Sequence, residues 1–101
     1  MKILIVEDEV GIANFLQQGL EEEGYTVLVA NDGKNGLELA LSQKVNIILL
    51  DWILPKMTGI EVCKSIRKTD TTTPIIFLTA KDTVQETIEG LKSGANDYIK
   101  K

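Results

Sequence analysis

The segment Ile3-Leu4-Ile5-Val6-Glu7-Asp8-Glu9 is a short aliphatic run that ends abruptly in three acidic residues. A compact run of branched aliphatic side chains is typical of a strand buried on both faces, as strands of parallel sheets are. The apolar residues that follow are spaced for one face of a helix: Ile12, Phe15, Leu16 and Leu20. Gly24 then provides a stop signal. The start of the chain therefore predicts a buried strand followed by an amphipathic helix, with Phe15 in the core.

The same alternation recurs along the chain. Further strands are expected over 26–30, 45–50, 74–79 and from 98 onward, with helical patterns between them. Asp32 can cap the second helix, and the pairs Thr58/Glu61 and Thr83/Glu86 have the spacing of capping boxes. Five strands alternating with helices predict parallel strands joined by right-handed crossovers. We therefore expect a doubly wound α/β sheet of flavodoxin-like order 2-1-3-4-5.

Composition narrows the possible functions. The 101 residues predict one domain, 1–101, and a net charge of −4 disfavours direct nucleic-acid or anionic-membrane binding. The absence of histidine excludes His-dependent catalysis and His-ligated zinc, and the single Cys63 excludes an internal disulfide. No apolar run is long enough for a membrane helix or a signal peptide, so a cytoplasmic chain is expected.

Acidic residues follow two strands that the predicted order makes neighbours. Glu7 and Asp8 end the first strand, and Asp51 ends the third, where the strand order reverses and ligands bind in such sheets. Unit charges ~5 Å apart at an effective dielectric of ~20 repel by roughly 3 kcal/mol, so a counter-charge is needed. Mg²⁺ supplies it, because it prefers oxygen ligands. Taken singly, Asp8 fits a helix N-cap and Asp51 a turn residue, but acids on both strands favour the metal site.

Two further side chains are expected at the same edge of the sheet. The fourth strand ends near Thr79, which offers a hydroxyl, and the fifth runs into Lys101, which offers an ammonium group. Acids, a metal, a hydroxyl and a cation suit phosphoryl transfer, in which positioning and charge neutralisation carry most of the catalysis. Asp51 is the candidate nucleophile, since a carboxylate can form an aspartyl-phosphate.

These motifs, in this order and spacing, resemble the receiver domain of bacterial two-component response regulators. The matching segments are Glu7-Asp8-Glu9, Leu50-Asp51-Trp52-Ile53-Leu54-Pro55 with Gly59, Leu78-Thr79-Ala80, and Gly94 to Lys101. The segment from Asp51 to Pro55 also resembles receivers that precede winged-helix DNA-binding domains. The resemblance thus implies transcriptional regulation through a C-terminal output domain.

The resemblance implies a role for each matched residue. Asp51 takes a phosphoryl group from a sensor histidine kinase. Asp8, Asp51 and the backbone carbonyl of Ile53 bind Mg²⁺, and Glu7 acts through metal-bound water. Thr79 and Lys101 contact the phosphoryl oxygens, and Tyr98 is the aromatic residue that changes position on phosphorylation. The domain would catalyse only its own phosphorylation and dephosphorylation.

Two positions are expected to set the lifetime of the phosphorylated state. Ile53 and Lys81 lie two residues after Asp51 and Thr79, beside the path of a hydrolytic water. An apolar Ile53 cannot orient that water, so we expect slow self-dephosphorylation.

The resemblance also implies a fifth helix, which has no counterpart in these 101 residues. That helix would cover the face of the sheet that carries the first helix. Without it, we expect either a destabilised monomer or an association, such as a homodimer, that covers the exposed apolar face. The basic residues Lys64, Arg67 and Lys68 are expected to form a solvated helix end.

Three alternative functions differ from this interpretation. A phosphatase of the haloacid-dehalogenase type needs an acid two residues after its nucleophile, where this chain has Ile53. A nucleotide-binding module would need a glycine-rich phosphate loop, which is absent from the sequence. The sequence also allows a pseudo-receiver, which binds proteins and never accepts a phosphoryl group.

Overall fold

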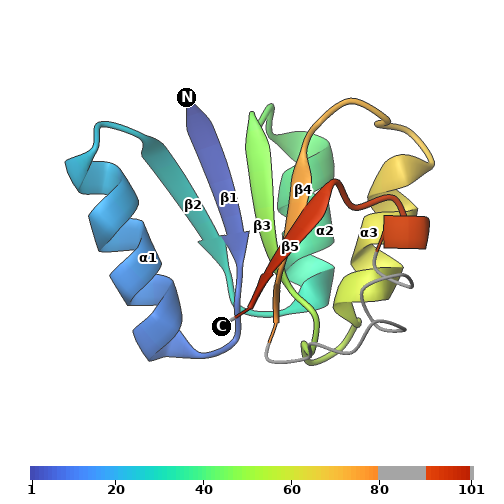
Figure 1. The fold of residues 1–101 in the computed structure, drawn as a ribbon, viewed down its shortest axis with the longest axis horizontal. Coiled ribbons are helices and arrows are strands. Elements are labelled where there is room, and N and C mark those ends of the chain that lie inside the picture. The colour runs from blue at the N-terminus through green and yellow to red at the C-terminus, as the bar shows by residue number, and fades with distance from the viewer. Residues whose placement is uncertain (80–90, 101) are drawn as a thin grey trace.

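Five parallel strands form a single sheet in the computed structural model, which describes residues 1–79 and 91–100. The strands are β1 (Lys2–Val6), β2 (Thr26–Ala30), β3 (Ile47–Asp51), β4 (Ile75–Thr79) and β5 (Asp97–Lys100). Their order is β2-β1-β3-β4-β5, which confirms the order predicted from the sequence. All carboxyl ends therefore point to the same edge of the sheet (Figure 1).

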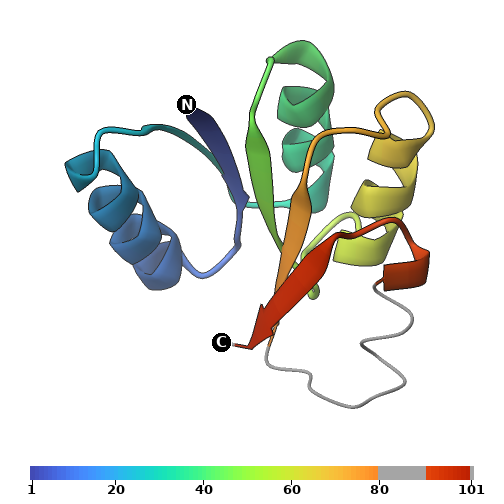
Figure 2. The ribbon, with the colours of Figure 1, turned by 45° about the horizontal axis from the view of Figure 1, so that its top comes forward.

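The helices cover the two faces of the sheet unequally. The described helices are α1 (Val10–Glu22), α2 (Gly33–Ser42) and α3 (Gly59–Arg67). α1 lies on one face, whereas α2 and α3 lie on the other (Figures 1 and 2). The helix predicted to begin at Thr83 falls mostly on residues 80–90, outside the described residues.

Successive side chains of β1 point to opposite faces of the sheet and so contribute to two separate parts of the core. Ile3 and Ile5 point toward α1, where Leu16 and Leu20 pack against them. Leu4 and Val6 point the other way, into the larger cluster beneath α2 and α3. Residues i and i+2 of a strand share a face, so one short aliphatic run supplies both layers.

Phe15 is not a core residue, contrary to the prediction from its spacing. Its side chain is 77% exposed, whereas Ala13 is buried. Ala13, Leu16 and Leu20 follow one stripe of α1, and Phe15 is rotated about 100° from Leu16 around the helix axis. Because α1 contacts the sheet along a narrow stripe, the larger side chain is left in solvent.

Capping determines where two of the helices begin. Asp32 is the N-cap of α2, with its carboxylate accepting from the backbone N–H of Asn35 at 2.8 Å. Thr58 forms the predicted capping box with Glu61, as each side chain accepts from the other residue's backbone N–H at 3.2 Å. α1 begins after Glu9, so Asp8 is not its N-cap.

Arg67 is a structural residue and not part of a solvated helix end. From the last position of α3 it donates to the carbonyls of Gly94 at 2.8 Å and Asp70 at 3.0 Å, and to Asn96 Oδ1 at 3.0 Å. Asn96 Oδ1 also accepts from the backbone N–H of Ile75 at 2.8 Å. The prediction missed the contacts with Gly94 and Asn96 because these two partners lie 27 and 29 residues after Arg67 in the sequence.

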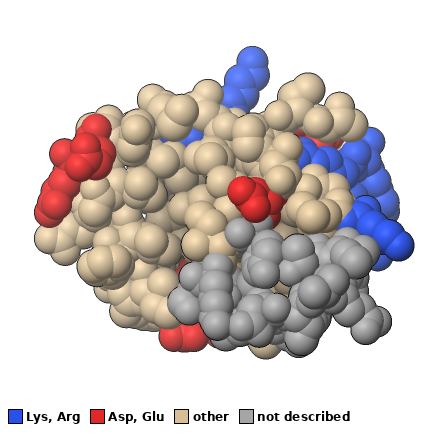
Figure 3. All heavy atoms as spheres, viewed as in Figure 1, with Lys and Arg blue, Asp and Glu red and all other residues tan. Residues whose placement is uncertain are grey.

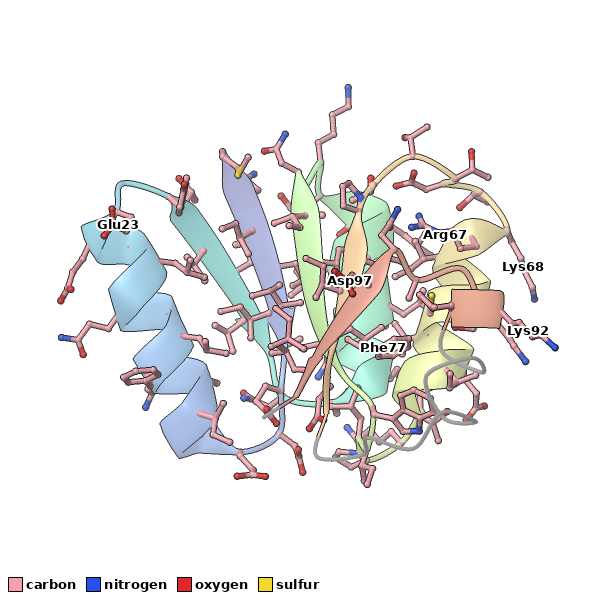
Figure 4. All side chains as sticks on the ribbon, viewed as in Figure 1. Glu23, Arg67, Lys68, Phe77, Lys92 and Asp97 are labelled. Carbon is pink, nitrogen blue, oxygen red and sulfur yellow. The ribbon has the colours of Figure 1, made fainter. Side chains whose placement is uncertain are left out.

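Charge and apolar surface are unevenly distributed. Basic side chains gather over α3, where Arg67, Lys68 and Lys92 lie, and acidic ones lie over the end of α1 near Glu23 (Figures 3 and 4). On the α1 side of the sheet, Ile99 is 52% exposed. Within residues 1–79 and 91–100, no helix is long and apolar enough to cross a membrane.

Candidate functional site

The site begins where β1 and β3 end side by side. Val6 pairs with Leu50, so Glu7 and Asp51 are the next residues of two adjacent parallel strands. Carboxylate oxygens of Glu7, Asp8 and Asp51 all lie within 4.8 Å of one another. Glu7 and Asp51 are buried, 0% and 3% exposed, whereas Asp8 is exposed. One side of the cluster is therefore enclosed by protein and the other is open to solvent.

The chemistry of this cluster fits a hard divalent cation. Three carboxylates at this spacing offer oxygen ligands only, which Mg²⁺ prefers. Two ionised carboxylates ~5 Å apart repel by roughly 3 kcal/mol at an effective dielectric of ~20, and burial of two of them reduces screening by water. A bound Mg²⁺ would offset this repulsion, and the exposed side leaves room for the waters that the ion retains.

Backbone contacts hold Glu7 in place. Its N–H donates to the Ala30 carbonyl at 3.0 Å, which continues the β1–β2 ladder. Its own carbonyl accepts from Asn31 Nδ2 at 3.0 Å, and its Oε2 accepts from the backbone N–H of Glu9 at 3.2 Å. Asn31 was not identified as a site residue from the sequence. Its position directly after β2, beside the acids that follow β1, was the available signal.

The chain leaves Asp51 in a tightly packed turn. The backbone N–H of Trp52 donates to the Leu78 carbonyl at 3.2 Å, and that of Gly59 donates to the Trp52 carbonyl at 3.0 Å. A Cβ atom at Gly59 would lie 2.3 Å from the carbonyl oxygen of Asp51, so only glycine fits there. The Trp52 ring lies 5.1 Å from that of Phe77, whose position beneath α3 is seen in Figure 4. These contacts fix the backbone that follows Asp51.

Of the remaining predicted site residues, three lie in the part of the chain that the structure describes and two lie outside it. Ile53 follows in the β3–α3 loop with its side chain 63% exposed. Thr79 is the last residue of β4, one position beyond Leu78, which pairs with Asp51. Tyr98 lies in β5 opposite Phe77. Lys81 and Lys101 lie outside the described residues.

Comparison with known proteins decides the family. A family model for the response regulator receiver domain matches residues 3–101. The chain belongs to this family. The receiver domain is therefore a response-regulator module of two-component signalling, as the resemblance predicted.

Individual relatives agree with this assignment. The receiver is 48% identical over 99 residues to the Bacillus subtilis (strain 168) protein YkoG, which is described as an uncharacterized transcriptional regulatory protein; the match covers 98% of this chain and 43% of YkoG. The solved receiver domain of the Francisella response regulator 1452 superimposes with a TM-score of 0.93 at 41% identity, covering 99% of this chain and 83% of that one.

A third relative was solved in a chemically informative state. It is a Burkholderia pseudomallei response regulator with a phosphorylated aspartic acid, a calcium ion and citrate. It matches with a TM-score of 0.91 at 27% identity and covers 99% of this chain and 59% of that chain. The receiver spans less than half the length of curated relatives such as YkoG.

Proposed function

We propose that this receiver is a phospho-accepting signalling domain that takes a phosphoryl group from a sensor histidine kinase onto Asp51 in a Mg²⁺-dependent reaction. The observation that supports this most directly is the convergence of three carboxylates at the ends of β1 and β3, within 4.8 Å. The Burkholderia relative, with its phosphorylated aspartic acid and calcium ion, supports the same chemistry.

The proposed transfer is a displacement at phosphorus. A carboxylate oxygen of Asp51 forms the new O–P bond, and the bond from phosphorus to the donor's imidazole nitrogen breaks, so the imidazole leaves. Glu7, Asp8, Asp51 and the Ile53 backbone carbonyl would hold Mg²⁺. When bound, the ion offsets the repulsion between the negatively charged phosphoryl oxygens and the acidic cluster. The receiver itself orients the acceptor oxygen through the packed turn after Asp51 and catalyses no reaction beyond its own phosphorylation and dephosphorylation.

Phosphorylation would then shift the receiver between two states. The phosphoryl group adds negative charge and new acceptor oxygens. The state in which Thr79 and Lys101 contact these oxygens gains population, with Tyr98 changing position. The surface around β5 would then differ between the two states.

The parent protein would use this surface to control transcription. Relatives such as YkoG are described as transcriptional regulatory proteins and are more than twice as long as this chain. We therefore propose a C-terminal output domain beyond the receiver, and a homodimer as one consequence of the switched surface.

Intact-mass spectrometry after incubation with acetyl phosphate and Mg²⁺ tests the proposal. The expected result is one added phosphoryl group, with acetate released, in the unmodified chain and in the control variant Asp70→Asn, but not in Asp51→Asn. No adduct in the folded, unmodified chain would instead support the pseudo-receiver. Continuous release of inorganic phosphate from a phosphate monoester, in place of acetyl phosphate, would support a hydrolase.

The lifetime of the adduct tests the proposed role of Ile53. Replacing Ile53, which is 63% exposed, by asparagine adds a group that can orient water and should speed loss of the phosphoryl group. The same decay measured for Lys81→Ala examines the other position. An unchanged decay rate in Ile53→Asn would refute the role of this side chain.

A further inference from the structure

The β3–α3 loop, residues 52–58, is held in place by α2 as well as by its own flanking elements. Gly33, the first residue of α2, donates its backbone N–H to the Pro55 carbonyl at 3.2 Å. A Cβ atom at Gly33 would lie 2.1 Å from the Met57 carbonyl oxygen. The loop therefore rests directly on the backbone at the start of α2, with no space for a side chain between them.

A second contact joins the same two segments. Lys56 Nζ lies 3.5 Å from a carboxylate oxygen of Asp32, the N-cap of α2. Lys56 has a φ of 69°, a left-handed conformation that non-glycine residues adopt only when their surroundings maintain it. Asp32 is itself held by Asn35, whose backbone N–H and Nδ2 both donate to it at 2.8 Å. The partner of Lys56 is thus a rigid one.

The loop needs such support because the Ile53 side chain does little to fix the backbone at that position. The Ile53 side chain is 63% exposed, so it does not anchor the backbone, whereas Leu54 is 7% exposed and packs into the core. The direction of the Ile53 carbonyl depends on the peptide planes on either side of it. Those planes are set by Trp52, held on β4, and by Pro55, held on Gly33.

We propose that Asp32 and Gly33 are positioning residues for the metal site, because they hold the β3–α3 loop, which carries the Ile53 carbonyl two residues after Asp51. This inference rests on the proposed function, since it takes the Ile53 carbonyl as a ligand of Mg²⁺. Neither residue is among the proposed ligands of the ion. Residues that orient metal ligands typically change metal affinity by 10–100-fold when they are replaced.

Titration calorimetry with MgCl₂ on the full chain tests the inference. Gly33→Ala inserts a methyl group against the Met57 carbonyl and should weaken Mg²⁺ binding by about 10-fold. Gly19→Ala is the matched control, because a Cβ atom there meets nothing within 4 Å. Unchanged affinity in a folded Gly33→Ala variant would overturn the inference.

A second pair of variants separates positioning from general loss of stability. Asp32→Asn weakens the contact with Lys56 and should lower Mg²⁺ affinity severalfold, and it decides the question if Gly33→Ala does not fold. Asp70→Asn is its control, because Asp70 also accepts backbone N–H groups, those of Thr72 and Thr73. Equal loss of affinity in both variants, or none in Asp32→Asn, would overturn the inference.

The unmodified chain distinguishes the two levels of the proposal. If it binds Mg²⁺ and only the Gly33 and Asp32 variants are weakened, both proposals are supported. If it binds Mg²⁺ and these variants bind equally well, the positioning role alone fails. If the folded, unmodified chain does not bind Mg²⁺, the proposed function fails and the positioning role fails with it.

Discussion

Replacing Arg67 by methionine removes three hydrogen bonds that join the end of α3 to the segments that precede β4 and β5. The guanidinium group donates to the carbonyls of Gly94 and Asp70 and to Asn96 Oδ1, at 2.8 to 3.0 Å. Methionine keeps most of the apolar stem, which packs against Gly94, where a Cβ atom would lie 2.5 Å from Arg67 Cγ. The substitution therefore tests the hydrogen bonds more than the packing.

The size of the effect follows from the burial of the three acceptors. A hydrogen bond to a charged group contributes about 1.5–3 kcal/mol, with the lower end appropriate where water reaches the pair. The bonds to Gly94 and Asp70 are partly buried and the one to Asn96 is exposed. We count only the two partly buried bonds, at the lower end of this range, and therefore expect a total loss of about 3 kcal/mol in the free energy of unfolding. At about 4–8 °C per kcal/mol for a domain of this size, Tm should fall by roughly 12–24 °C.

Urea unfolding followed by circular dichroism measures this loss. Lys68→Met is the matched control, because Lys68 follows Arg67 at the end of the same helix and is exposed. An exposed substitution of this kind should change stability by no more than about 0.5 kcal/mol. If Arg67→Met costs no more than Lys68→Met, the hydrogen bonds to the β5 side do not stabilise the receiver. A double-mutant cycle with Asn96→Ala should show coupling of about 0.5 kcal/mol or more.

Three further predictions concern single side chains. Hydrogen bonds from Thr73, and then from Thr72, lower the pKa of Asp70 from 3.8 to about 2. A depressed carboxyl pKa stabilises the fold above the unfolded value, so the stability advantage over Asp70→Asn should be complete at neutral pH and disappear between about pH 4 and 2 in acid titrations followed by urea unfolding. Burial raises the pKa of the Cys63 thiol, so iodoacetamide should label it only after unfolding, and rapid labelling of the native receiver would contradict its burial. Phe15→Ala should change the free energy of unfolding by less than about 0.5 kcal/mol, and a loss of the size seen for core phenylalanines would show that α1 packs differently.

Sequence alone determined the elements of this receiver and their order. The aliphatic run 3–6 and the similar runs after it could become only buried strands, because branched side chains at both parities need cover on two faces. The capping residues Asp32 and Thr58 marked helix starts by contacts within three residues. The acids at 7, 8 and 51 could be assigned to one edge, since parallel strands end together. All of this depends on short-range patterns and on general rules of connection.

Tertiary structure decided which side chains those elements actually use. Periodicity assigned Phe15 to the core and did not single out Ala13, whereas the contact between α1 and the sheet buries Ala13 and leaves Phe15 77% exposed. Arg67 appeared to be one of several helix-end cations until Gly94 and Asn96 were brought beside it. Nothing in the sequence around Gly33 indicated that the Met57 carbonyl packs against it. Such contacts join residues distant in sequence, and their energies depend on distances that no local pattern contains.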